Sequence, residues 1–317
     1  MPFQTEEGGF ETRRYGESNA GPLDVRAALK EGIARLRAAG VPSDTLAAEL
    51  LLMHALGRDR SWVYTHPEYS LASGESEDYF ALIARRAAGE PTQYLTGKQE
   101  FWGLEFEVTP AVLIPRPETE HVVEVALERL GERGIKINMK TGEPSPTLRI
   151  ADVGTGSGCM AVALARELPH SDIVATDITA PALDVARRNA ARHQVSDRIR
   201  FVLTNLLEGL HQSHPFDLIV SNPPYIARDE AASLPVEVRE HEPHSALFGG
   251  PSGVEIYEGL IQQAGGLLGA GGILVLELGY NSADAVRKML QAGGHWANIN
   301  VTNDLAGIPR VIAAECA

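Results

Sequence analysis

The sequence predicts a doubly wound, parallel α/β sheet that ends in an antiparallel strand pair and follows a small helical domain. From residue 148 onward, short apolar runs alternate with helix-length amphipathic segments, which is the pattern of consecutive βαβ units. Glycines follow the first apolar run and two prolines follow the fourth, so the chain must turn sharply after both strands. Open α/β sheets build their ligand sites at such carboxyl ends.

The elements before the sheet divide into three segments. Residues 1–20 are polar, and we expect a disordered tail there. Residues 21–92 carry apolar positions at helical spacing and predict a helical domain. Residues 93–117 alternate aromatic and polar positions and then meet two prolines, which favours a β-hairpin linker with a stiff exit. Residues 118–317 form the second domain, which begins with a helix.

Within the second domain, apolar runs indicate parallel strands at residues 149–153, 172–176, 199–203, 216–221 and 272–278. Helices are expected over residues 254–268 and 282–290. Residues 296–301 and 310–314 predict the antiparallel pair that completes the sheet.

Composition excludes several classes of function. The 317 residues carry a formal net charge of −14, which argues against nonspecific nucleic-acid binding and leaves room for a basic protein partner. No apolar run is long enough to span a membrane. Two distant cysteines give neither a disulfide framework nor a metal spacing, so we expect no metal and a cytoplasmic location.

The glycine-rich turn after the first strand indicates a nucleoside site. The third glycine of a dinucleotide fingerprint would fall at position 159, which is Cys159, and no Lys-Ser/Thr pair of a phosphate loop follows. Asp177 ends the next strand about 20 residues further on, where a carboxylate can accept from both hydroxyls of a ribose. A nucleoside without a pyrophosphate suggests S-adenosylmethionine. The alternative is that Asp177 only caps the following helix.

The two prolines after the fourth strand belong to the run Asn222-Pro223-Pro224-Tyr225. A side-chain amide oxygen and a neighbouring carbonyl can accept both N–H bonds of a planar NH₂ group, and Tyr225 can pack against its face. The alternative is a proline-rich turn with no ligand.

Together these residues resemble the peptide chain release factor N5-glutamine methyltransferases over roughly residues 23–315. The resemblance includes segments 114–120 (Ile-Pro-Arg-Pro-Glu-Thr-Glu), 152–158 (Asp-Val-Gly-Thr-Gly-Ser-Gly), 222–226 (Asn-Pro-Pro-Tyr-Ile) and 304–310 (Asp-Leu-Ala-Gly-Ile-Pro-Arg). It implies a Rossmann-like class I methyltransferase fold. It also implies methyl transfer from S-adenosylmethionine, which leaves S-adenosylhomocysteine, to the glutamine of the Gly-Gly-Gln motif in class I release factors. We expect a monomer.

The chemistry and the resemblance assign roles to individual residues. Catalysis falls to Asn222, Pro223 and Tyr225, and substrate binding to these three with Pro224. The donor site comprises Asp152, Gly154, Thr155, Gly156, Ser157, Gly158, Asp177, Asn205, Leu206 and Asn222. At position 205 the family usually has an acid facing the adenine, and here an amide oxygen would have to accept instead.

Two other functions compete with this interpretation. Adenine N6 methyltransferases share the Asn-Pro-Pro-Tyr run, but acting on nucleic acid would need a basic groove and a flipped base. No such groove is visible in this acidic sequence. A nonenzymatic adenosylmethionine-binding module would have no need of the Asn-Pro-Pro-Tyr run.

Overall fold

A computed structural model describes residues 23–135, 147–210 and 214–317. The tail expected at residues 1–20 lies outside these ranges. By its internal contacts the chain divides into two compact units, the first ending at Ala87 and the second running from Ala88 to Ala317. The boundaries expected at residues 21–92, 93–117 and 118–317 stay predictions.

The first unit is helical, as expected. Its helices are α1 (Val25–Ala38), α2 (Asp44–Leu56), α3 (Arg60–Thr65) and α4 (Ser73–Ala87). Their apolar stripes pack together and bury Leu36, Leu51 and Ile83 completely. Asp24 and Asp59 start α1 and α3 by accepting from backbone N–H groups of the first turn.

The second unit begins with a short helix that the sequence did not predict, α5 (Thr92–Thr96). The expected hairpin follows it, with β1 (Lys98–Phe101) antiparallel to β2 (Leu104–Glu107). Its two turn residues, Trp102 and Gly103, both have positive φ, at 56° and 67°. Such dihedrals match the twist of a two-residue hairpin.

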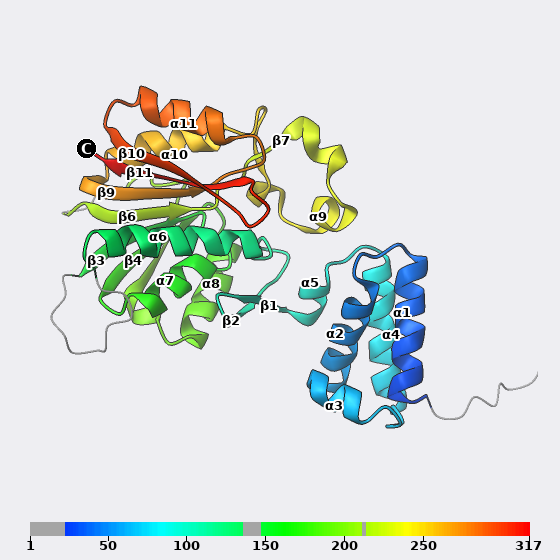
Figure 1. Ribbon diagram of the computed structural model, residues 1–317. Helices are drawn as coiled ribbons and strands as arrows, with labels where there is room; N and C mark the ends of the chain where they lie inside the picture. The colour runs from blue at the N-terminus through cyan, green and yellow to red at the C-terminus, as the bar shows by residue number, and fades with distance from the viewer. Residues whose placement is uncertain (1–22, 136–146, 211–213) are drawn as a thin grey trace, which may run out of the picture. The chain divides into compact units, whose positions relative to one another are not determined.

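A seven-stranded sheet forms the centre of the second unit, in the order β10-β11-β9-β6-β3-β4-β5 (Figure 1). The parallel strands are β3 (Leu148–Val153), β4 (Ser171–Asp177), β5 (Ile199–Leu203), β6 (Phe216–Ser221) and β9 (Leu268–Glu277). The antiparallel pair is β10 (Trp296–Asn303) with β11 (Pro309–Cys316), and β11 also pairs antiparallel with β9. The predicted fold class is confirmed.

Helices cover both faces of this sheet (Figure 1). Ile150 of β3 faces the core under α6 (Glu120–Glu132), α7 (Cys159–Glu167) and α8 (Ala180–Arg192). Ala151, its neighbour, faces the opposite core under α10 (Glu255–Gly265) and α11 (Ala283–Ala292). This alternation follows from the two-residue period of a strand. Within the described residues, no helix has the length and apolar character needed to cross a membrane.

An insertion between β6 and α10 extends the carboxyl edge of the sheet. It contains the parallel pair β7 (Ile226–Ala227) and β8 (Phe248–Gly250), the helix α9 (Val236–His241), and the 3₁₀ segments η3 (Arg228–Ser233) and η4 (His244–Ala246). Two further 3₁₀ turns, η1 (Pro117–Thr119) and η2 (Ser196–Arg198), precede α6 and β5. The insertion and η1 both contribute residues to the site.

Candidate active site

A pocket lies at the carboxyl ends of four neighbouring strands, β6, β3, β4 and β5. It spans the point between β3 and β6 where the strand order reverses, which is where open α/β sheets bind ligands. Among its lining residues are nine that the sequence predicted for the site: Gly154, Thr155, Gly156, Ser157, Asp177, Asn205, Leu206, Asn222 and Pro224. The lining also includes residues 111–113 from the segment after the hairpin and residues 243, 245 and 246 from the insertion.

The glycine-rich turn after β3 takes a conformation that requires glycine. Gly154, Gly156 and Gly158 have φ of 71°, 54° and 82°. Asp177 at the end of β4 holds this turn, because its Oδ2 accepts from the Gly156 N–H at 3.0 Å. The other carboxylate oxygen, Oδ1, accepts from the backbone N–H and the hydroxyl of Thr179 just before α8. Asp177 therefore orders the local backbone and also faces the pocket.

Two predicted donor-site residues, Asp152 and Gly158, lie behind the turn instead of lining the pocket. A Cβ on Gly158 would lie 3.0 Å from the Cβ of Ala186, so glycine lets the turn pack against α8. Asp152 is fully buried and accepts from the Thr155 hydroxyl at 2.6 Å and the Ala161 N–H at 3.1 Å. Burial raises the pKa of Asp152 to about 6, although both hydrogen bonds oppose the shift.

Cys159, the first residue of α7, lines the pocket but is buried. Burial and the nearby Asp152 carboxylate raise the pKa of its thiol to about 12, so it stays protonated and a poor nucleophile. Within the described ranges, no three His, Cys, Asp or Glu side chains gather as metal ligands would.

The far end of the pocket is formed by the turn after β5. Leu206 has a positive φ of 53°, and Gly259 of α10 leaves room for its side chain. Asn205 donates from Nδ2 to the Glu208 carboxylate at 2.7 Å, which leaves its Oδ1 as an acceptor. This is the polarity that the amide needs if it replaces an acid at this position.

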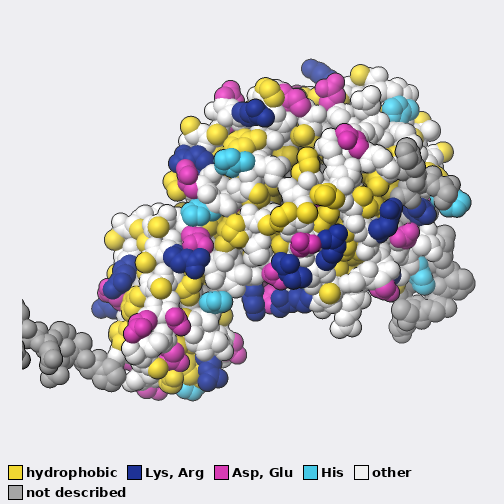
Figure 2. Space-filling view, turned by 180° about the vertical axis from the view of Figure 1, so that it is seen from behind, with side chains coloured by type: hydrophobic (Ala, Val, Ile, Leu, Met, Phe, Trp, Pro, Cys, Tyr) yellow, Lys and Arg dark blue, Asp and Glu magenta, His cyan; other side chains and the backbone are white. Residues whose placement is uncertain are grey.

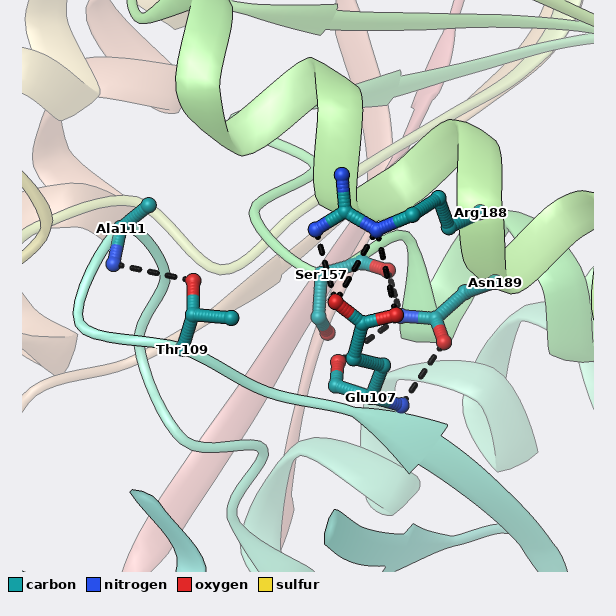
Figure 3. A network of polar contacts seen from close by, with 6 residues as sticks. All are labelled: Glu107, Thr109, Ala111, Ser157, Arg188 and Asn189. Atoms are coloured by element: carbon teal, nitrogen blue, oxygen red, sulfur yellow. Dashed lines mark hydrogen bonds and ion pairs between the residues drawn. The ribbon is translucent and has the colours of Figure 1, made fainter. Parts of the chain in front are cut away.

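Asn189 of α8 ties the hairpin to the glycine-rich turn (Figure 3). Its Oδ1 accepts from the Glu107 N–H at 2.7 Å, and its Nδ2 donates to the carbonyls of Glu107 and Ser157 at 2.9 and 2.8 Å. The neighbouring Arg188 binds the Glu107 carboxylate through two nitrogens on the half-exposed surface. One buried amide thus fixes both β2 and the turn that lines the pocket.

On the other side of the pocket, Asn222 follows β6 and donates from Nδ2 to the Thr119 hydroxyl at 3.0 Å. Thr119 in turn donates to Oε2 of Glu277, the last residue of β9, at 2.6 Å. Tyr225 donates to Oε1 of the same carboxylate at 3.2 Å. Pro223 is buried, and neither it nor Tyr225 lines the pocket. The ring of Tyr225 packs against Gly279, where a Cβ would lie 2.6 Å from its Cδ2.

Two glycines of the insertion support the backbone of this segment. A Cβ on Gly249 would lie 2.5 Å from the Pro224 carbonyl oxygen, and one on Gly253 would lie 2.4 Å from that of Tyr225. Gly253 also has a positive φ of 81°. The insertion can approach the Pro-Pro-Tyr backbone this closely only because both positions lack a side chain.

An ion pair connects the segment before η1 to the insertion. Arg116 lines the pocket and donates to Glu242 at 2.5 Å. Glu242 is buried, and burial raises the pKa of its carboxyl although the positive charge of Arg116 opposes the shift. Neither Arg116 nor Thr119 was predicted as a site residue from the sequence, although both lie in the Ile-Pro-Arg-Pro-Glu-Thr-Glu segment. Glu277 was not predicted as a site residue either. Its position at the carboxyl end of the central strand β9 is the signal that could have identified it.

The chain matches known proteins along most of its length. Residues 27–97 match the PrmC N-terminal domain, and residues 133–237 match the methyltransferase small domain. The release factor glutamine methyltransferase of Koribacter versatilis is 43% identical over 92% of this chain and 99% of that protein. The one from Chlorobaculum tepidum is 44% identical over 89% of this chain and 94% of that protein. The chain belongs to the release factor glutamine methyltransferase family.

Solved structures show the same fold at low sequence identity. The hMettl16 catalytic domain, solved in complex with hairpin 6 of the MAT2A 3′ UTR, is 19% identical with a TM-score of 0.53. The match covers 73% of this chain and 80% of that chain. At this identity the similarity concerns the fold alone.

Proposed function

We propose that the protein transfers a methyl group from S-adenosylmethionine to the side-chain amide nitrogen of the glutamine in the Gly-Gly-Gln motif of class I release factors. The observation that carries the proposal is the orientation of Asn222. Its NH₂ group is engaged by Thr119, so its oxygen is left to accept from a substrate in the pocket. Membership of the family supplies the substrate class.

The pocket has the chemistry expected for the donor. Asp177 can accept from ribose hydroxyls while it holds the Gly156 N–H, and Asn205 and Leu206 offer an acceptor and an apolar surface to adenine. Ser157 also lines the pocket, and its hydroxyl interacts with the buried Cys159 thiol. S-adenosylmethionine supplies a methyl group on a sulfonium, which is already activated for displacement. S-adenosylhomocysteine would remain as the product.

The protein's contribution is to position and polarise the substrate amide. An amide nitrogen is a weak nucleophile because its lone pair is delocalised into the carbonyl. The Asn222 oxygen and the Pro223 carbonyl accept its two N–H bonds and hold the nitrogen in line with the methyl group. Both acceptors face the positive charge that grows on nitrogen as the new bond forms. The carbon–sulfur bond breaks with its electron pair on sulfur, and the nitrogen then loses a proton to solvent.

Tyr225 takes a supporting role in this proposal. Its hydroxyl is bound to Glu277 and its ring lies against Gly279, so it supports the Asn222 segment from behind. This differs from the expected packing of the tyrosine ring on the substrate amide, which stays a prediction.

The competing nucleic-acid function has less support. On the face in Figure 2, Lys and Arg side chains are interspersed with Asp and Glu and form no continuous basic surface. Arg188 and Arg192 of α8 are paired with Glu107 and Glu105. The helical unit, which matches the PrmC N-terminal domain, is assigned to release-factor recognition. The proposed substrate implies that the enzyme works in the cytoplasm, and a monomer remains our expectation.

The experiment that tests the function is methyl transfer from labelled S-adenosylmethionine to a purified class I release factor, followed by mass spectrometry. A release factor with Gln→Ala in its Gly-Gly-Gln motif is the control. We expect one methyl group on that glutamine and none on the variant. Label that appears in nucleic acid and not in the release factor would overturn the proposal.

A further inference from the structure

The mechanism above does not use one buried carboxylate that lies next to the catalytic asparagine. Glu277 is 1% exposed and does not line the pocket. It nevertheless accepts hydrogen bonds from Thr119 and Tyr225, and Thr119 is also the partner of Asn222. Glu277 is therefore one side chain removed from the amide that is proposed to hold the substrate.

The direction of these hydrogen bonds follows from the groups involved. A threonine hydroxyl has a single hydrogen, and an ionised carboxylate can only accept. Thr119 therefore gives its hydrogen to Glu277 at 2.6 Å and can only accept from Asn222, at 3.0 Å. An acceptor at this position selects the NH₂ end of the Asn222 amide and turns its oxygen away.

We propose that Glu277 is a positioning residue that acts through Thr119 to hold the Asn222 amide with its oxygen toward the substrate. The inference rests on the proposed function, because it assumes that the Asn222 oxygen accepts from the substrate nitrogen. A flipped amide would present two N–H donors to the N–H bonds of the substrate, and the nucleophile would not be held. The hydrogen-bond chain from Asn222 through Thr119 to Glu277, called the relay from here on, stabilises one of the two nearly isosteric orientations of the amide.

The groups around Glu277 control whether its carboxylate is ionised. Arg310 of β11 contributes a positive charge and is itself paired with Asp304 at 3.0 Å. Glu118 of η1 contributes a negative charge, and the hydroxyl groups of Tyr225 and of Tyr257 in α10 lie nearby. Burial disfavours the ionised carboxylate more than these contacts stabilise it, and it raises the pKa of Glu277 to about 7.

Protonation of Glu277 removes the directionality of the relay. The protonated carboxyl has a hydrogen of its own to donate to the Thr119 oxygen. The hydroxyl of Thr119 is then free to donate toward Asn222, which favours the flipped amide. Turnover should therefore rise with pH through the region near 7, while donor binding, on the opposite side of the pocket, should not follow this rise.

Three variants test the relay. Thr119→Val removes the hydroxyl at nearly constant volume, Thr119→Ser keeps it, and Glu277→Gln removes the ionisable acceptor. We expect Thr119→Val and Glu277→Gln to lower kcat roughly tenfold or more, with donor affinity from calorimetry changed less than about twofold. Thr119→Ser should recover most of the lost turnover. The rise of kcat near neutral pH should disappear in Glu277→Gln.

The outcomes separate this inference from the proposed function. If the unmodified enzyme transfers no methyl group to release-factor glutamine, the proposed function is wrong. If it does, and Thr119→Val keeps the same kcat, the relay is wrong and the function stands. Equal losses in Thr119→Val and Thr119→Ser would indicate a packing role for Thr119 and would also overturn the relay. If Glu277→Gln does not fold, the pH profiles of the Thr119 pair decide the role of Glu277, because the rise of kcat near neutral pH should be kept in Thr119→Ser and lost in Thr119→Val; a rise that persists in Thr119→Val would overturn the relay.

Discussion

Asn222 has its two polar ends in different environments, since Nδ2 binds Thr119 while the side chain borders the pocket. We expect Asn222→Ala to lower kcat roughly 100-fold or more, because the substrate nitrogen loses an acceptor that strengthens as charge develops. Donor affinity, measured by calorimetry, should change little. Asn300→Ala on the exposed edge strand β10 is the matched control and should have normal turnover. Unchanged turnover in Asn222→Ala would exclude the proposed mechanism.

Asp177 is the residue on which donor binding should depend most directly. Asp177→Ala removes the proposed ribose acceptor and the bond that holds the Gly156 N–H. We expect donor affinity to fall by about 1–3 kcal/mol, read from calorimetry with S-adenosylmethionine. Asp184→Ala on the exposed face of α8, where Asp184 pairs with Arg187 at the surface, should bind the donor normally. Equal affinities in the two variants would remove Asp177 from the site.

A buried amide and a surface ion pair both connect β2 to α8, and the amide also reaches the glycine-rich turn (Figure 3), so we expect the amide to contribute more to stability. Asn189→Ala leaves the Glu107 N–H and the Ser157 carbonyl without a hydrogen-bond partner. Each buried, unsatisfied group should lower the free energy of unfolding by about 1–3 kcal/mol. Arg188→Ala breaks only a half-exposed pair and should cost less than about 1 kcal/mol. Urea denaturation of both variants measures the difference. Similar losses would mean that the amide is not the main connection.

The insertion should tolerate a side chain at Gly253 badly. Gly253→Ala adds a methyl group 2.4 Å from the Tyr225 carbonyl oxygen, so the Pro-Pro-Tyr segment must shift. Gly134→Ala is a close control, because Gly134 has a similar φ of 78° but, among the residues that the structure describes, no atom within 4 Å of its Cβ position. We expect both variants to have a lower Tm in thermal unfolding, because alanine is strained at a positive φ. Only Gly253→Ala should lose methyl transfer. Equal activities would show that the segment can move without consequence.

Elements with strong local signals were predicted from the sequence, and those without were not. The strands β3 and β6 are buried on both faces and therefore appear as continuous apolar runs. The helix α5 is five residues long between Pro91 and Gly97, too short to show a helical period. Glu277 contacts Thr119 across 158 residues, and that contact exists because α6, which directly follows Thr119, packs against β9. No local pattern encodes such a neighbour.

At the scale of the whole molecule, the buried Glu277 should make stability depend on pH. Its pKa is about 7 in the folded state against an ordinary value of 4.5, so the folded protein keeps a proton that the unfolded chain releases. The corresponding stability is present below about pH 4.5 and is lost as pH rises through about 7. Glu277→Gln does not titrate, so its free energy of unfolding relative to the unmodified protein should increase from about pH 5 to about pH 8, by up to ~3 kcal/mol.

Urea denaturation at the two pH values measures this effect. Glu128→Gln on the exposed face of α6 controls for the loss of one negative charge. If the Glu277→Gln and unmodified proteins show parallel pH dependence, folding does not raise the pKa of Glu277 and its carboxylate is already ionised in the folded protein over this range. The expected increase would instead mean that stability and orientation oppose each other at this residue, since the charged form that directs Thr119 is the form that burial disfavours.

The strand order also sets the sequence in which the last strands can join the sheet during synthesis. β11 follows β10 along the chain but lies between β10 and β9 in the sheet. When β10 leaves the ribosome, its eventual neighbour has not yet been made, and the position beside β9 is still open. Arg310, the positive charge near Glu277, arrives with that last strand. The turns after β3, β4 and β5 are therefore synthesised well before the last of the charges that we propose to orient Asn222.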